Sequence, residues 1–171
     1  MKRVIVIGCP GSGKTTFAQK LAGRSGVPLF HLDAIWHKPD RTHIPRDEFD
    51  VRLGQILGLD QWIIDGNYSR TLERRMATCD TVVFFDLTTE VCLDGAIARL
   101  GQKRPDMPWI DTALDPKLKV EIERFTVENR PAILDLIDRY KGEKQIVIFE
   151  SRAEADAFLQ ESRDGAKPND V

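Results

Sequence analysis

The chain has 171 residues, of which 42% are hydrophobic and 30% are charged, and its formal net charge is −2 at pH 7. This length allows one compact domain with a sizeable core and excludes two ordinary domains. The composition excludes a disordered or membrane-embedded chain, and the slightly acidic balance argues against the basic surface typical of nucleic-acid binding. The three cysteines include no C-x-x-C pair, which argues against a disulfide framework or a zinc site.

Short apolar runs typical of β-strands alternate with helical patterns along the chain. The runs comprise residues 4–7, 28–31, 62–64, 81–85 and 145–149. Strands that alternate with helices form a parallel sheet covered on both faces. We therefore predict an α/β fold of three layers with a five-stranded parallel sheet, in one domain over residues 1–162. Residues 163–171 are polar and are expected to form a disordered tail.

Between these runs, apolar residues recur at the i, i+3, i+4 spacing of amphipathic helices. The spacing predicts helices around residues 17–22, 49–57, 93–100 and 118–140. Asp115 can cap the last of these and Pro116 suits its first turn, whereas Pro131 should kink or divide it. Ser151 and Glu154 form a capping-box pattern that opens a final helix.

A glycine-rich segment directly follows the first predicted strand. Residues 8–15, GCPGSGKT, match the phosphate-loop pattern G-x-x-x-x-G-K-[ST] at every fixed position. Glycines let successive backbone N–H groups point at one anion, and the helix that begins there adds its own N–H groups. Lys14 supplies charge for the β- and γ-phosphates, and Thr15 supplies a hydroxyl for magnesium. The predicted cofactors are ATP and Mg²⁺, and the predicted cofactor-binding residues are Gly8, Pro10, Gly11, Ser12, Gly13, Lys14, Thr15 and Thr16.

Among P-loop proteins, the small-molecule kinases agree best with this chain, which is short and contains no N-K-x-D guanine signature. Residues 62–70 resemble the D-G-F-P-R region of adenylate kinases. The resemblance implies that Asp65 helps to hold magnesium, with Asp86 at the end of another predicted strand as a competitor. Arg70 comes one residue later than the family arginine that grips the acceptor phosphate, and Ser69 stands in its place.

The next part of the chain resembles the adenylate kinase lid. Residues 98–104 look like the helix end that opens the lid, and Arg124 and residues 130–131 resemble the stretch after it. We therefore expect a short mobile lid over residues 101–115. Arginines near a lid can close over phosphates and exclude water, or they can form a solvated basic face. The candidates are Arg99, Arg104, Arg124 and Arg130.

A wider set of motifs covers nearly the whole chain: GCPGSGK at 8–14, HLD at 31–33, Trp36, IIDGNY at 63–68, RPDM at 104–107 and RP at 130–131. This set resembles the adenylate-kinase-like family called DNA topology modulation proteins. The resemblance implies a phosphotransferase fold, whereas the family name implies a link to DNA supercoiling. The sequence itself shows no helix-turn-helix, basic arm or zinc site for direct DNA contact.

The acceptor-binding region is expected at residues 33–60. Asp33 follows the second predicted strand, where related small kinases place a carboxylate that can orient or deprotonate a hydroxyl; a loop or cap aspartate is the alternative. Trp36 can stack on a base or sugar, or pack in the core. The remaining candidates in this region are His31, His37, Arg46 and Arg52.

These patterns predict an ATP-dependent phosphotransferase that acts on a small hydroxyl or phosphate acceptor, such as a nucleotide or nucleoside. The alternatives are a nucleotide-dependent regulator linked to DNA topology, and a slow ATPase. No apolar run approaches the roughly 18 residues of a membrane span, so we expect a cytoplasmic protein without membrane partners. The predicted catalytic residues are Lys14, Asp33, Arg99, Arg104 and Arg130.

Overall fold

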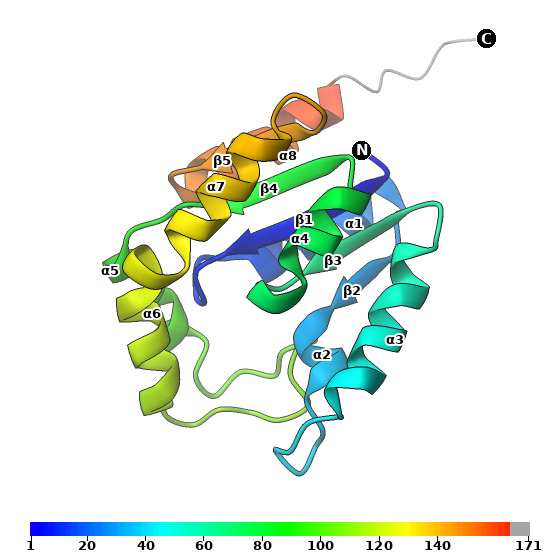
Figure 1. Ribbon diagram of the computed structural model, residues 1–171. Helices are drawn as coiled ribbons and strands as arrows, with labels where there is room; N and C mark the ends of the chain where they lie inside the picture. Colours follow the sequence, from blue (N-terminus) through cyan, green and yellow to red (C-terminus); the bar gives the residue numbers. More distant parts are fainter. Residues whose placement is uncertain (165–171) are drawn as a thin grey trace, which may run out of the picture.

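The computed structural model describes residues 1–164 and shows one parallel five-stranded sheet between layers of helices (Figure 1). The strand order is β2-β3-β1-β4-β5, with every neighbouring pair parallel. The strands are β1 (Arg3–Gly8), β2 (Leu29–His31), β3 (Trp62–Asp65), β4 (Thr81–Phe85) and β5 (Gln145–Phe149). The predicted α/β fold with five parallel strands is therefore confirmed.

Helices cover both faces of the sheet and bury its apolar strands. Helices α1 (Lys14–Ser25) and α8 (Arg152–Asp164) pack together on one face. Helices α4 (Ser69–Thr78) and α7 (Arg130–Tyr140) pack together on the other face. Strands enclosed on both sides are expected to be continuously apolar. The central strand β1 meets this expectation, because residues 4–7 are at most 1% exposed.

The remaining helices are α2 (Leu32–Trp36), α3 (Arg46–Leu57), α5 (Thr89–Ala98) and α6 (Pro116–Glu128). The predicted long helix is divided between α6 and α7, as the proline at the start of α7 requires. The predicted cap of α6 is confirmed, since an Asp115 oxygen accepts the backbone N–H of Lys117 at 2.8 Å. The helix expected over residues 93–100 ends at Ala98, so that Leu100 lies beyond it.

Two helices, α2 and α4, were not predicted from apolar spacing. Helix α4 has the sequence SRTLERRMAT and buries Leu72 and Met76 together with the polar Thr71 and Arg75. With only two large apolar residues among many charged and polar ones, this helix offers no run of apolar side chains at helical spacing, which is the pattern used for prediction. Helix α8 runs to Asp164, past the expected domain end at 162, and residues 165–171 of the predicted tail lie outside the described residues.

The strand register gathers four loops at one edge of the sheet. Val6 pairs with Asp65 and Gly8 pairs with Phe85, so the ends of β1, β3 and β4 lie side by side. The end of β2 joins them through the pairing of His31 with Asp65. Binding sites in parallel α/β sheets form at this carboxyl edge. None of the helices over residues 1–164 combines the length and apolar composition that a membrane span requires.

Candidate active site

The loop between β1 and α1 has the shape that wraps an anion. Gly8 and Gly11 have φ angles of 148° and 83°, a backbone region that favours glycine. A Cβ atom on Gly8 would lie 2.6 Å from the carbonyl oxygen of Phe85, and one on Gly11 would lie 2.1 Å from that of Cys92. Only glycine fits at these two positions. Helix α1 begins at Lys14, so the free N–H groups of its first turn face the loop.

Two side chains from distant segments hold this loop in place. The Asn67 side-chain oxygen accepts the Gly8 N–H at 2.9 Å. The Arg152 guanidinium donates to the carbonyl oxygens of Gly11 at 2.9 Å and of Ser12 at 3.3 Å. The loop geometry is therefore fixed by the protein itself, which suits a preorganised anion site.

A cavity of about 470 Å³ opens on one side of the loop. It is lined by the start of α1, by the α5 end, by the lid residues 102–106 and by the start of α8. Its lining is strongly basic, as a site for a polyphosphate requires. The basic residues of this lining are Lys14, Lys20, Arg99, Lys103, Arg104 and Arg152, and the acidic ones are Asp106 and Asp156.

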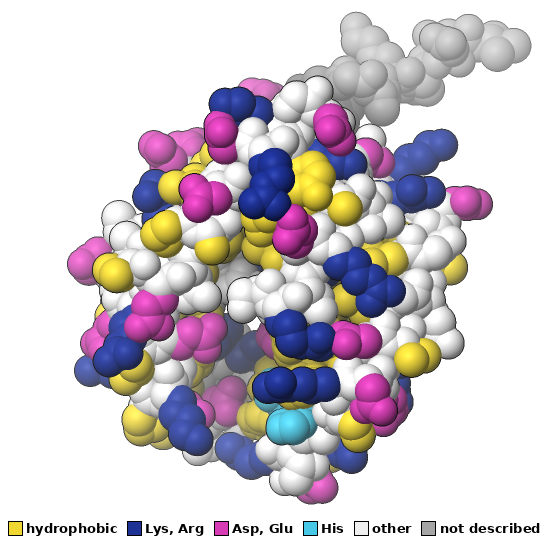
Figure 2. Space-filling model, viewed as in Figure 1, with side chains coloured by type: hydrophobic (Ala, Val, Ile, Leu, Met, Phe, Trp, Pro, Cys, Tyr) yellow, Lys and Arg dark blue, Asp and Glu magenta, His cyan; other side chains and the backbone are white. Residues whose placement is uncertain are grey.

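A second cavity, of about 480 Å³, opens on the other side of Lys14. Figure 2 shows a hollow in this face between α6 and the α2–α3 side of the molecule, with charged side chains of both signs around it. Aromatic side chains of Trp36, Tyr68 and Trp109 line this cavity. Its acidic residues are Asp33, Asp106, Asp111, Asp115 and Glu121, and its basic residues are Lys14, Lys117, Arg99 and Arg104.

The two cavities meet at a small group of polar side chains. Five residues line both cavities: Lys14, Thr15, Arg99, Arg104 and Asp106. The junction can therefore be reached from both cavities. Two ligands bound in adjoining cavities would meet at such a junction, where their encounter is effectively intramolecular.

The predicted lid segment, residues 101–115, contains no helix or strand and contributes Arg104 and Asp106 to this junction. The Arg104 guanidinium bonds both oxygens of Asp106, one of them at 3.1 Å, and lies 3.7 Å from Asp111. The Trp109 N–H donates to Asp111 at 2.8 Å. Burial alone would raise the pKa of Asp106, but the bonds and charge of Arg104 lower it below its ordinary value. Asp106 is therefore an ionised partner of Arg104.

The lid also contacts the acceptor-binding region predicted at 33–60. The Trp109 ring meets the His37 ring edge-on at 5.2 Å, and the Arg41 guanidinium lies 5.2 Å from the Trp109 centroid. Burial lowers the pKa of His37, which favours its neutral form. An aromatic and cation–π contact thus joins the lid to the loop after α2.

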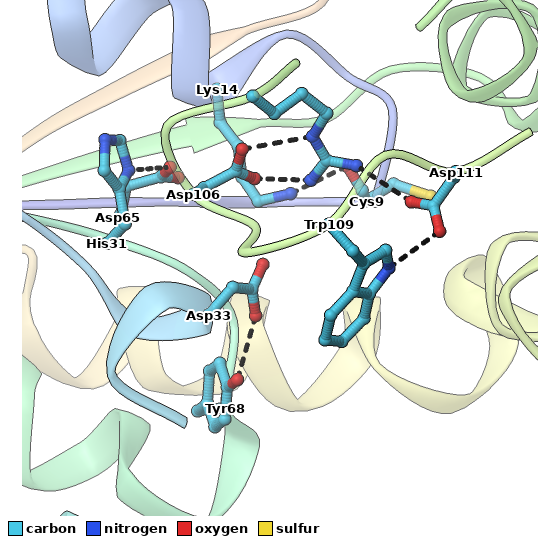
Figure 3. A network of polar contacts seen from close by, with 10 residues as sticks. Cys9, Lys14, His31, Asp33, Asp65, Tyr68, Asp106, Trp109 and Asp111 are labelled. Carbon is cyan, nitrogen blue, oxygen red and sulfur yellow. Dashed lines mark hydrogen bonds and ion pairs between the residues drawn. The ribbon is translucent and has the colours of Figure 1, made fainter. Parts of the chain in front are cut away.

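Asp33 lies at the floor of the second cavity. Figure 3 shows one of its oxygens directed at Tyr68 and the other turned toward the side on which Lys14 and Asp106 lie. The Tyr68 hydroxyl donates to Asp33 at 2.9 Å. Burial raises the pKa of Asp33 above its ordinary value, although the Tyr68 bond and the Lys14 charge oppose this rise. A carboxylate with a raised pKa beside a cationic phosphate site is well placed to accept a hydroxyl proton.

The turn that carries Asn67 and Tyr68 is held by Arg75, which is fully buried. Its guanidinium donates to the carbonyl oxygens of Gly66 at 2.8 Å, of Tyr68 at 3.1 Å, and of Asn67. Burial lowers the pKa of Arg75 to about 9. Tyr68 has a left-handed backbone, with φ of 38°, that aims its ring at Asp33. Arg75 therefore determines where two site residues point.

Of the two aspartates predicted to compete for magnesium, Asp65 keeps one oxygen free and Asp86 does not, and neither lines the two cavities. One Asp65 oxygen bonds His31 Nδ1 at 3.0 Å, and the other is buried without a hydrogen-bond partner. Asp86 instead uses both oxygens on Arg130, at 2.7 and 2.8 Å. Within residues 1–164, no three His, Cys, Asp or Glu side chains cluster as metal ligands. Magnesium needs no such cluster, because phosphate oxygens and water supply most of its ligands.

Several predicted arginines are not brought to the site. Arg130, which was predicted to be catalytic, pairs with Asp86 and lines neither cavity, and its predicted role stays a prediction. Arg124 pairs with Glu128 on the exposed face of α6. Ion pairs also hold Arg52 and Arg70, and none of Arg46, Arg52 and Arg70 lines either cavity.

Other residues of the site were not given roles from the sequence. Tyr68 and Asp106 belonged to quoted motifs, but their partners became visible only in the fold. Arg152 was assigned only to a helix start. Glu121 lies within an amphipathic helix, where a charged residue signals nothing unusual. In each case the role depends on residues that are distant in the sequence and become neighbours only in the fold.

Comparisons with known proteins identify the fold. No known family profile and no curated protein matches this sequence. Among solved structures, the crystal structure of shikimate kinase from Bacteroides thetaiotaomicron is similar, with a TM-score of 0.57 and 18% identity over 95% of this chain and 97% of that chain. This chain therefore has the α/β P-loop fold that shikimate kinase also has.

Proposed function

We propose that this chain is an ATP-dependent phosphotransferase that moves the γ-phosphoryl group to a hydroxyl of a small acceptor. The observation that carries the proposal is the junction of the two cavities at Lys14, Thr15 and Arg99. A nucleotide-binding ATPase needs only the first cavity. A second cavity of similar volume, with a carboxylate directed at the junction, supports an acceptor other than water. The likeness to shikimate kinase, a small-molecule kinase by name, agrees with this function.

The residues divide the chemistry between them. Phosphoryl transfer needs alignment and positive charge around the transferred group more than covalent help. Lys14 and Arg99 supply that charge, and Arg104 fixes the lid through Asp106. Asp33 orients the acceptor hydroxyl and takes its proton. The Thr15 hydroxyl and the free oxygen of Asp65 are suited to hold magnesium and its water, and the metal would neutralise charge on the phosphates.

The experiment is ADP release from magnesium-ATP, alone and with a panel of small hydroxylated compounds. Lys14→Ala serves as the blank. A phosphotransferase should release ADP much faster with an accepted compound than without it. Equal rates with and without every compound would contradict the proposal and favour a regulator or a slow ATPase.

A further inference from the structure

The two cavities differ in which charged lining residues lack a neighbouring residue of opposite charge. In the second cavity, here called the acceptor cavity, the charge of Arg104 is already opposed by Asp106 and Asp111. Lys14 and Arg99 lie at the junction, where they serve the transferred phosphoryl group. Lys117 also lines this cavity and is exposed, as is Glu121 one turn further along α6. Among the described residues, no further lysine or arginine lines the acceptor cavity.

The carboxylates of the same cavity are less well compensated. Asp33 accepts one bond, from the neutral Tyr68 hydroxyl, and Glu121 forms no ion pair or hydrogen bond with any described residue. Burial raises the pKa of Glu121; the charges of Lys14 and Arg99 lower it, and that of Asp33 raises it. Glu121 thus shares one electrostatic environment with Asp33 and the junction. An anion placed between these carboxylates would meet like charge, and juxtaposed like charges weaken binding.

The walls of the cavity are suited to a ring. Trp36, Tyr68, Trp109 and the neutral His37 ring line it. Trp36 stacks on His43 at 4.3 Å, and Tyr68 stacks on Phe49 at 5.1 Å, so both rings are held rigidly. Fixed aromatic surfaces bind flat rings, the C–H faces of sugars, and cations.

We infer that the acceptor is a hydroxylated ring compound that carries no phosphate or carboxylate group, and that Glu121 excludes anionic acceptors. This inference rests on the proposed function and defines its substrate class. Asp33 holds the reacting hydroxyl, and the free carboxylate of Glu121 favours an uncharged or amine-bearing ring. Nucleoside monophosphates and shikimate, which are anions, fall outside this class.

The test uses acceptors in matched pairs that differ in charge: uridine with its monophosphate, and glucosamine with glucuronate, together with shikimate. Two readouts are needed. Tryptophan fluorescence reports binding without ATP, because Trp36 and Trp109 line the cavity while Trp62 is buried in β3. ADP release reports transfer.

The matched variants are Glu121→Gln and Glu123→Gln. Glu123 lies on the same helix, pairs with Lys119 and lines neither cavity. We expect the uncharged and amine compounds to bind, and their kcat/KM to exceed that of their anionic partners at least about tenfold. Glu121→Gln should lower the ratio of kcat/KM for the uncharged or amine compound to that for its anionic partner, and Glu123→Gln should leave this ratio unchanged.

The outcomes separate the inference from the proposed function. A monophosphate, glucuronate or shikimate that is the better acceptor would overturn the inference and leave the phosphotransferase standing. Selective binding of uncharged compounds without faster ADP release would overturn the phosphotransferase and support the selectivity of the cavity. Binding of none of the uncharged or amine compounds would overturn the inference.

Discussion

The first cavity, proposed for the nucleotide, and the second cavity, proposed for the acceptor, have nearly equal volumes of about 470 and 480 Å³. They differ in the balance of basic and acidic residues in their linings. The first is lined by six lysines and arginines and two aspartates, and the second by four lysines and arginines and five acids. The acidic cavity is assembled from side chains of several separate segments, from the loop before α1 to the end of α6. Kinases that use the same phosphoryl donor can share one phosphate loop. Their specificity for different acceptors depends on side chains that can vary independently of that loop.

The largest effect should follow from removing the cation at the junction. Lys14→Ala should lower phosphoryl transfer by at least about 10³-fold, because one preorganised charge on the transferred group is lost. The fold should remain, since the lysine side chain forms only one hydrogen bond, to the Cys9 carbonyl at 3.3 Å. ADP release and thermal unfolding would be measured together, with the exposed Lys119→Ala as control. Near-normal phosphoryl transfer in Lys14→Ala would contradict the assignment of this site.

The next effect separates acceptor chemistry from nucleotide binding. Asp33→Asn should lower kcat by about 10²–10³-fold while the Kd for ATP stays the same, because the general base is lost. The measurement is single-turnover transfer beside ATP titration. Equal loss of transfer and ATP affinity would indicate a structural role for Asp33.

The same variant makes a prediction about stability. The pKa of Asp33 is raised in the folded protein, so the folded state binds the proton more tightly than the unfolded state does. Its ionised form therefore costs stability, and this cost grows as pH rises from the ordinary aspartate pKa through the raised one. At pH 7, Asp33→Asn should keep or raise Tm, by about 2–4 °C per kcal/mol regained. At acid pH the gain should vanish, and a lower Tm at pH 7 would contradict the assigned burial cost.

A third comparison tests which arginines belong to the junction. Arg99→Ala should lower kcat by about 10²-fold, because Arg99 lines both cavities and its guanidinium forms no ion pair or hydrogen bond with a described residue. Arg130→Ala should leave kcat within about twofold and lower Tm slightly, since it breaks an ion pair with Asp86. The reverse order of effects on kcat would support the predicted catalytic role of Arg130 and contradict that of Arg99.

The smallest effect concerns the tuning of Asp33. Tyr68→Phe keeps the ring stacked on Phe49 but removes a bond that lowers the pKa of Asp33. That pKa should therefore rise, and the acid limb of the kcat/KM profile should move to higher pH. Tyr140→Phe, on α7 outside both cavities, is the matched control. An unmoved limb would show that Asp33 does not control the profile.

The fold and the phosphate loop could be predicted because both depend on local pattern. The strand of residues 4–7 is continuously apolar, and Gly8 and Gly11 occupy positions where a side chain would clash. Helix α4 escaped prediction because its buried stripe includes Arg75. Its apolar content alone could not reveal that this arginine binds three backbone carbonyl groups.

The acceptor side could be predicted only in part. Asp33 and Trp36 were singled out from their position after a strand, and both line the cavity. Arg104 and Arg130 had equal standing in the sequence, and only the fold separates an arginine at the junction from one bound to Asp86. Glu121 gave no signal, because its neighbours at the junction come from other segments.

The most direct test of the central claim, that a phosphoryl group passes from one cavity to the other, is the fate of γ-labelled ATP. The protein would be incubated with labelled magnesium-ATP and the best compound of the acceptor panel, and the products separated. Our account predicts label in the acceptor, equal in amount to the ADP formed and abolished in Lys14→Ala. Label recovered only as inorganic phosphate, at a rate indifferent to every acceptor, would contradict it.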